Sequence, residues 1–157
     1  MSLLGSMAWL QNLSLSSKLM MGFAIPRTDR RRAGNPLWNH YPCGDGKWLA
    51  MGMLQADRYW STVCRAIGRP ELAEDERFAT LLVRAKHADE CIAILDEVLA
   101  TKPRDEWLKI FSEAGDLIIT ALNSVDDLPD DPQMQANGYV QEFAHPQMRI
   151  SRDSSTS

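Results

Sequence analysis

The feature that most constrains the fold is the Asp45-Gly46 pair, which lies between two runs rich in Trp, Tyr, Leu and Met side chains. The two runs flank Gly44-Asp45-Gly46 and together extend from residue 37 to residue 53. An Asp-Gly pair readily adopts the positive φ angles that a tight hairpin requires. The pattern therefore predicts two antiparallel strands joined by a short turn.

Helical periodicity dominates the sequence after the hairpin. Apolar residues recur on one face in residues 56–67, 84–100 and 103–115. Gly68 and Gly115 follow two of these segments, as glycine often does after the last turn of a helix. We therefore predict three long helices in this part of the chain.

Shorter signals fill the remainder of the sequence. Residues 117–122 form an apolar run rich in isoleucine and predict a buried strand. Ser124 and Asp127 have the spacing of a capping box, and residues 131–137 predict a short helix that begins with Asp-Pro. A last strand is predicted at residues 139–143. The fold class is therefore α+β, a small antiparallel sheet with a β-hairpin packed against several helices.

The N-terminal segment differs in character from the rest. Residues 7–23 predict one helix that is apolar nearly all round and needs a partner surface, whereas residues 1–6 are expected to be unstructured. We divide the chain into an apolar helix with an Arg-rich connector at residues 1–33, a compact domain at residues 34–148 and a disordered tail at residues 149–157.

Composition narrows the cellular setting. The formal net charge of −4 disfavours a nucleic acid as partner, because the phosphate backbone would be repelled. Polar residues interrupt the apolar N-terminal segment, so neither a signal peptide nor a membrane span is expected. Cys43, Cys64 and Cys91 form no Cys-x-x-Cys pair, which argues against a disulfide framework and a zinc site. A cytoplasmic protein with no metal is predicted.

Short landmarks follow one another along the chain in a specific order. They are Asn35-Pro36, Asp45-Gly46-Lys47-Trp48, Gly68-Arg69-Pro70-Glu71-Leu72, Arg77-Phe78-Ala79-Thr80, Glu106-Trp107 and Asp131-Pro132-Gln133. In this order the sequence resembles the small domain of family III (CaiB/BaiF-type) CoA-transferases. The resemblance implies an α+β domain held against a larger nucleotide-binding-like domain, and it implies acyl-CoA chemistry.

The resemblance also implies a reaction, the transfer of CoA between an acyl-CoA and a carboxylic acid. In the family an Asp carboxylate attacks the thioester, and that Asp belongs to the larger domain, upstream of this sequence. We therefore assign no catalytic residue here and expect a partial CoA-transferase that is inactive alone. The alternative is a non-catalytic binding or oligomerisation module derived from the small domain. The expected partner is the missing large domain or a second copy, as in a homodimer.

One local departure from the family concerns a loop near the substrate. Members often carry Gly-Val-Pro after the position of Gly115, whereas this chain reads Asp116-Leu117-Ile118. The difference predicts a changed loop at the border of the substrate site.

The candidate CoA-binding residues are Arg30, Arg31, Arg32 and Asn35. Guanidinium groups can hold the pyrophosphate and ribose phosphate of CoA bidentately, although a solvated linker is the simpler interpretation. The resemblance places Asn35 where the chain enters the small domain, near the substrate cleft. CoA or acyl-CoA is expected as a substrate, and no covalently bound cofactor is expected.

Other conspicuous residues receive structural interpretations. Asp45 is assigned to the hairpin turn, and the histidines have no motif that suggests catalysis or metal binding. Cys43 lies near the turn and is interpreted as an inert thiol. Aromatic residues on periodic elements are predicted to pack in the core rather than to form a ligand cage, namely Trp38, Trp48, Trp60 and Trp107.

Overall fold

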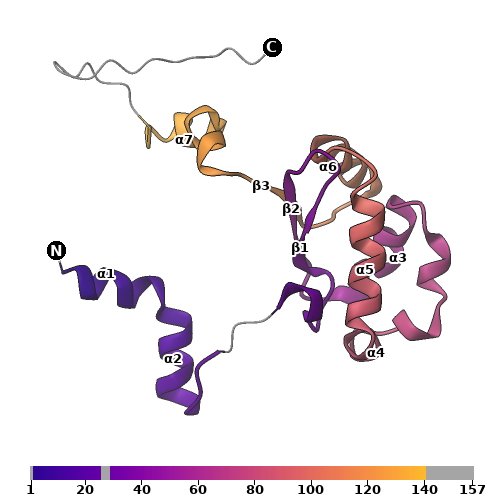
Figure 1. The fold of residues 1–157 in the computed structure, drawn as a ribbon, viewed down its shortest axis with the longest axis horizontal. Coiled ribbons are helices and arrows are strands. Elements are labelled where there is room, and N and C mark those ends of the chain that lie inside the picture. The colour runs from indigo at the N-terminus through magenta and orange to yellow at the C-terminus, as the bar shows by residue number, and fades with distance from the viewer. Residues whose placement is uncertain (1, 26–28, 141–157) are drawn as a thin grey trace.

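The computed structural model of the chain describes residues 2–25 and 29–140. It has the predicted α+β architecture, with a three-stranded antiparallel sheet in the order β1-β2-β3 and helices against one face (Figure 1). The tail predicted at residues 149–157 lies outside the described residues. So does most of the strand predicted at 139–143, and the two described residues of that segment, Tyr139 and Val140, are not in a strand.

The predicted hairpin is confirmed. Strands β1 (Trp38–Pro42) and β2 (Trp48–Gly52) pair antiparallel. The Asp45 carboxylate accepts a hydrogen bond of 3.2 Å from the Lys47 backbone N–H, which is the structural role predicted for it. Within this turn Gly46 alone has a positive φ, of 77°, so a single left-handed residue closes the turn. The Asp-Gly pair thus supplies one left-handed residue and one side-chain acceptor.

The third strand, β3 (Ile119–Leu122), pairs with the other edge of β2. The prediction of a strand here is right, but the prediction that it is buried is wrong. Its residues alternate between half-buried and exposed. The reason is that β3 is an edge strand and helices cover only one face of the sheet, so every second side chain is left at the surface.

Three helices form the layer behind the sheet, α3 (Ala56–Ala66), α5 (Ala88–Leu99) and α6 (Arg104–Ala114). Their apolar faces and the inner face of the sheet make one core. Trp60 and Trp107 are buried there as predicted, and each indole N–H donates to a backbone carbonyl, of Leu72 at 3.1 Å and of Leu99 at 2.9 Å. Both buried indoles therefore have their polar atom paired.

The single helix predicted at residues 84–100 is wrong, because α4 (Leu81–Lys86) ends and α5 begins at Ala88. His87 lies between them with non-helical angles, φ −114° and ψ 30°. Apolar residues keep their spacing across this break, so the pattern resembles one helix. The two helices are held by different contacts, since α4 is oriented by its fully buried Arg84 and α5 by the sheet.

Arg84 links three parts of the helical layer. Its guanidinium donates to the Phe78 carbonyl and the Asp57 carboxylate and lies 4.6 Å from the centre of the Trp60 ring. These contacts join α4 to α3 and to the short 3₁₀ helix η3 (Glu76–Phe78). A buried cation of this kind is tolerated because opposite charge, a carbonyl and an aromatic face surround it.

The other elements after residue 29 are short. They are η1 (Arg30–Arg32), η2 (Pro70–Ala73), η4 (Val125–Asp130) and α7 (Pro132–Ala136). The predicted capping box is confirmed, because the Ser124 backbone N–H donates to the Asp127 carboxylate at 2.7 Å. The short helix predicted to begin with Asp131-Pro132 is also confirmed, with Asp131 as its N-cap.

The N-terminal segment forms two helices, α1 (Leu3–Leu10) and α2 (Asn12–Met21), so the prediction of one helix is wrong. The prediction that residues 1–6 are unstructured is also wrong for residues 2–6, since Ser2 accepts a hydrogen bond from the Gly5 N–H and caps α1. Both helices lie apart from the sheet in Figure 1 and expose large apolar side chains, including Trp9 and Met20. No helix among the described residues is long and apolar enough to cross a membrane.

The hairpin turn is fastened to the loop between α5 and α6 through Gly44. Its backbone N–H donates to the Lys102 carbonyl at 2.8 Å, and a Cβ at this position would lie 2.6 Å from the Ala100 carbonyl oxygen. Gly44→Ala should therefore lower the free energy of unfolding by about 2 kcal/mol, because the backbones must separate. Gly34→Ala is the matched control, since a Cβ there meets no atom within 4 Å. Urea unfolding measures both, and equal stability of the two variants would contradict the docking.

Candidate functional site

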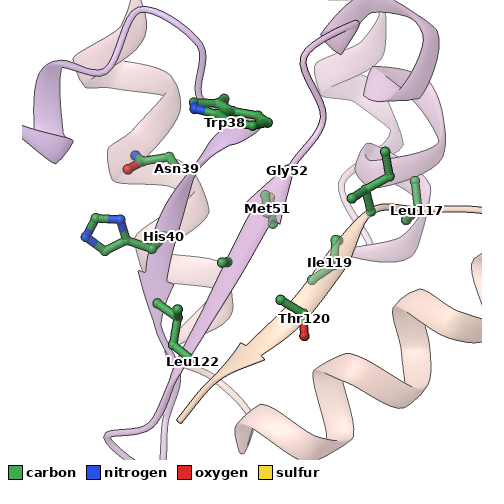
Figure 2. Close-up of a pocket in the computed structure, with 11 residues that line it drawn as sticks. Trp38, Asn39, His40, Met51, Gly52, Leu117, Ile119, Thr120 and Leu122 are labelled. Carbon is green, nitrogen blue, oxygen red and sulfur yellow. The ribbon is translucent and has the colours of Figure 1, made fainter. Parts of the chain in front are cut away.

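The face of the sheet opposite the helices is uncovered. In each strand alternate side chains point to opposite faces. Tyr41, Leu49 and Met51 point toward the helices and are buried. The other face carries exposed or half-buried residues, which are Trp38, His40, Ala50, Gly52 and Thr120. Figure 2 shows this face, with the pocket residues drawn over the three strands.

The strand register turns this face into a groove. Trp38 pairs with Gly52, and His40 pairs with Ala50, which in turn pairs with Thr120 on the third strand. At Ala50 and Gly52 the central strand presents small residues between larger ones, whereas Trp48 lies on the same face nearer the turn. The resulting hollow has a volume of about 640 Å³, which lies within the usual range of small-molecule sites. We define this hollow as the sheet groove.

Gly52 lies between two larger side chains of the sheet groove, those of Ile118 and Trp38. A Cβ built on Gly52 would lie 3.1 Å from Cγ2 of Ile118 and 3.9 Å from the Trp38 ring. The Gly52 backbone N–H donates to the Ile118 carbonyl at 2.8 Å, which holds the two residues together. Ile118 belongs to the segment whose sequence departs from the family pattern. This segment therefore borders the groove, and the change predicted for its loop stays a prediction.

A second hollow of about 430 Å³ continues beyond His40 toward the turn of the hairpin. At its edge, the centres of the His40 and Trp48 rings lie 5.6 Å apart. Its one carboxylate is Asp127, whose pKa is held below its usual value by hydrogen bonds from the Ser124 backbone N–H and hydroxyl. This carboxylate is occupied as the cap of η4, so its role is structural.

The structure separates Arg30 from its two neighbours. The Arg30 guanidinium forms an ion pair of 2.8 Å with Asp96 and lies 5.4 Å from the centre of the Trp48 ring. Arg30 thus fastens the connector to the edge of the sheet. Arg31 and Arg32 are exposed, and neither side chain forms an ion pair within the described part of the chain. Of the three arginines, these two have exposed side chains.

Asn35 has both ends of its side-chain amide engaged. The amide N–H donates to the Met53 carbonyl at 3.1 Å, and the amide oxygen accepts from the Leu37 N–H at 3.0 Å. The Trp38 N–H donates to the Asn35 carbonyl at 2.9 Å, so Asn35 lies at the Trp38 end of the sheet groove. Its clear role is to hold the chain entry against the end of β2.

Two tryptophans predicted in the core lie elsewhere. Trp38 is 52% exposed on the uncovered face and Trp48 is half-buried, so the core prediction is wrong for both. Neighbouring positions of a strand face opposite sides of the sheet, and both tryptophans lie on the uncovered side rather than on the side facing the helices. The groove residues Ala50, Gly52 and Ile118 were not predicted as a site. The small residues of β2 indicate a groove only when the register of the three strands is known, because the register decides which larger residues flank them.

The three cysteines are buried, including Cys43 beside the hairpin turn. Burial raises the pKa of the Cys43 thiol to about 11 and of the Cys64 and Cys91 thiols to about 12. Thiols with such pKa values are protonated at neutral pH and are poor nucleophiles. This agrees with the interpretation of Cys43 as inert.

Comparison with known proteins assigns the family. The family model of CoA-transferase family III matches residues 1–154, and the chain therefore belongs to this family. A solved CAIB/BAIF family protein from Brucella suis superposes with a TM-score of 0.72 at 25% identity, covering 84% of this chain and 34% of that one. The α+β domain described above is thus a fold that this family contains.

Two relatives of known reaction are similar in sequence. The (R)-2-hydroxy-4-methylpentanoate CoA-transferase of Clostridioides difficile is 31% identical over 111 residues, 71% of this chain and 28% of the relative. The cinnamoyl-CoA:phenyllactate CoA-transferase of Clostridium sporogenes is 29% identical over 119 residues, 75% of this chain and 29% of the relative. The chain thus spans less than a third of the length of either relative.

The buried thiols predict how stability depends on pH. The folded protein keeps these thiols protonated, whereas an unfolded thiol ionises near pH 8.5. The contribution of the buried, protonated thiols to the free energy of unfolding is fully present below about pH 8.5. It is lost as the pH rises through the folded pKa values, and each thiol loses at most about 1.4 kcal/mol for each pH unit. The free energy of unfolding should therefore be flat from pH 7 to 8 and fall above about pH 9.

A thiol reagent provides the control at pH 8. The native chain should not react and the urea-unfolded chain should react at all three cysteines, Cys43, Cys64 and Cys91. Rapid labelling of the native chain at any of them would show that the thiol is accessible and contradict the burial.

Proposed function

We propose that this chain supplies the small-domain side of a CoA-transferase site, at which CoA passes between an acyl-CoA and a carboxylic acid. The observation that carries the proposal is the sheet groove, an apolar hollow on the face of the domain that its own helices leave uncovered. Membership of CoA-transferase family III supports the reaction class. The two relatives named above support it as well, since both are CoA-transferases by name.

The proposed role is to position the acyl group rather than to attack it. Such a reaction needs a nucleophile. A carboxylate can attack the thioester carbonyl, which expels CoA thiolate and forms a mixed anhydride, and the thiolate then attacks the carboxyl carbon of the nucleophile, which releases the first acid and leaves a CoA thioester. The acceptor acid takes CoA from this thioester by the reverse sequence, through a second anhydride. Among the described residues, no Asp or Glu side chain lines the sheet groove. We therefore propose that the nucleophile comes from another domain and that this chain is inactive by itself.

The apolar N-terminal helices support a partner in this arrangement. Leu4, Trp9, Leu10, Leu13 and Met20 are each at least three-quarters exposed. Contiguous apolar surface of this kind marks an interaction site. We propose that α1 and α2 are covered by the large domain of such an enzyme or by a second copy in a homodimer. The three buried free thiols are in keeping with a reducing cytoplasm.

We also propose that any contact with the phosphates of CoA is made by Arg31 and Arg32, while Arg30 and Asn35 hold the local structure. The double variant Arg31→Ala/Arg32→Ala should weaken CoA binding by about fivefold, with less effect at high salt because exposed charges are screened. Arg30→Ala should instead lower the free energy of unfolding by about 1–2 kcal/mol, since it loses an ion pair and an aromatic contact.

Calorimetric titration with CoA and urea unfolding separate these two effects. Lys86→Ala removes an exposed positive charge on α4 and serves as the matched control. If CoA binding is tight, insensitive to salt and unchanged in the double variant, the phosphate contacts lie elsewhere.

A chimera tests the proposed function. Residues 30–140 replace the matching segment of the Clostridioides difficile relative, and CoA transfer is followed by chromatography of the thioesters. The chimera should transfer CoA, whereas the isolated chain should show none above background. A folded but inactive chimera would favour the alternative, a non-catalytic binding or oligomerisation module. Turnover by the isolated chain that one Asp substitution abolishes would overturn the proposed division of roles.

A further inference from the structure

We propose that Gly52, together with Ala50, determines which acyl groups the domain accepts, and that the sheet groove takes the apolar side chain of a monocarboxylic acyl group. A branched aliphatic or phenyl side chain is the class that fits. The inference rests on the proposed function and names the substrate class for the same site.

The dimensions of the groove follow from the strand register. Neighbouring strands lie about 4.8 Å apart, so β1 and β3 are separated by about 10 Å across β2. Trp38 and Ile118 flank Gly52 in one row, and His40 and Thr120 flank Ala50 in the next. Small residues form the floor of the slot between these walls, and its apolar walls can contact the side chain of an acyl group. Figure 2 shows Trp38 and His40 on β1, Gly52 on β2 and Thr120 on β3.

The chemistry of the lining selects an uncharged occupant. Trp38 is 52% exposed and Ile118 is 54% exposed, so both present apolar surface that an acyl group would cover. No Asp, Glu, Lys or Arg side chain lines the groove among the described residues. The polar side chains of the walls are those of His40 and Thr120, so a second carboxylate placed here would lose hydration and meet no Lys or Arg side chain, which is costly. The groove therefore disfavours dicarboxylic acyl groups.

Gly52 is the position where a small change would alter the slot most. A Cβ at Gly52 would contact Cγ2 of Ile118 at 3.1 Å. The φ angle of Gly52 is not in the left-handed region, so other residues can adopt the same backbone. Ile118 is at the surface and can turn away, which allows Gly52→Ala and Gly52→Val to fold. Such variants should narrow the slot and leave the helical core intact.

The experiment uses the full chain and three free acids as probes, 4-methylpentanoate, 3-phenylpropanoate and glutarate. Amide resonances of ¹⁵N-labelled protein are followed during titration. The two apolar acids should shift the amides of residues 50–52 and 118–120, and glutarate should bind about tenfold more weakly or not at all. Gly52→Val should weaken the apolar acids by about tenfold. Gly34→Val is the matched control and should bind as the unaltered chain does, because position 34 is open.

Three results would overturn the inference. The first is an absence of shifts in residues 50–52 and 118–120 with either apolar acid, including the case in which the shifts lie in α1 and α2. The second is equal binding of glutarate, and the third is unchanged binding in a folded Gly52→Val variant. If the chimera described above transfers CoA while one of these results holds, the proposed reaction stands, and the inference about the sheet groove and Gly52 is lost.

Discussion

The alternation of side chains along β2 is the constraint on which the rest of the structure depends. Leu49 and Met51 face the helices and are buried in the core, whereas Ala50 and Gly52 face the other way. One strand therefore anchors the hydrophobic core and forms the floor of the sheet groove. Because the side-chain period of a strand is two, a register shift by one residue would exchange these roles and destroy both features.

The helical layer holds this strand in place through contacts of two kinds. Apolar packing supplies most of the stabilisation, as in any domain of this size. Specific polar contacts then orient the pieces, with Arg84 joining α4 to α3 and Arg30 fastening the connector to the sheet edge through Asp96. A groove shaped by strand register needs such a rigid support, because a small change in strand position would change its width.

Sequence reasoning succeeded where short-range rules decide the structure. The Asp45-Gly46 turn, the capping box at Ser124 and the start of α7 at Asp131-Pro132 each depend on residues close in sequence, and the structure contains all three. It failed where distant parts of the chain decide. The break at His87 and the exposure of Trp38 depend on what packs against each residue, which local patterns do not report.

The candidate site illustrates the same limit. The residues proposed for CoA from their charge were Arg30 to Arg32, yet the structure commits Arg30 to Asp96 and leaves only Arg31 and Arg32 exposed. The groove, in contrast, is made of residues with no charge or reactive group. Gly52 and Ile118 become neighbours only through the pairing of β2 with the segment that enters β3.

The central claim is that the uncovered face of the sheet is the functional face of this domain. Hydrogen–deuterium exchange of the chimera, with and without a bound acyl-CoA, tests it most directly. The account predicts that the ligand slows exchange in peptides covering residues 48–53 and 117–122 and leaves α3 and α5 unchanged. Slower exchange confined to the helical layer, with none in these two segments, would contradict it.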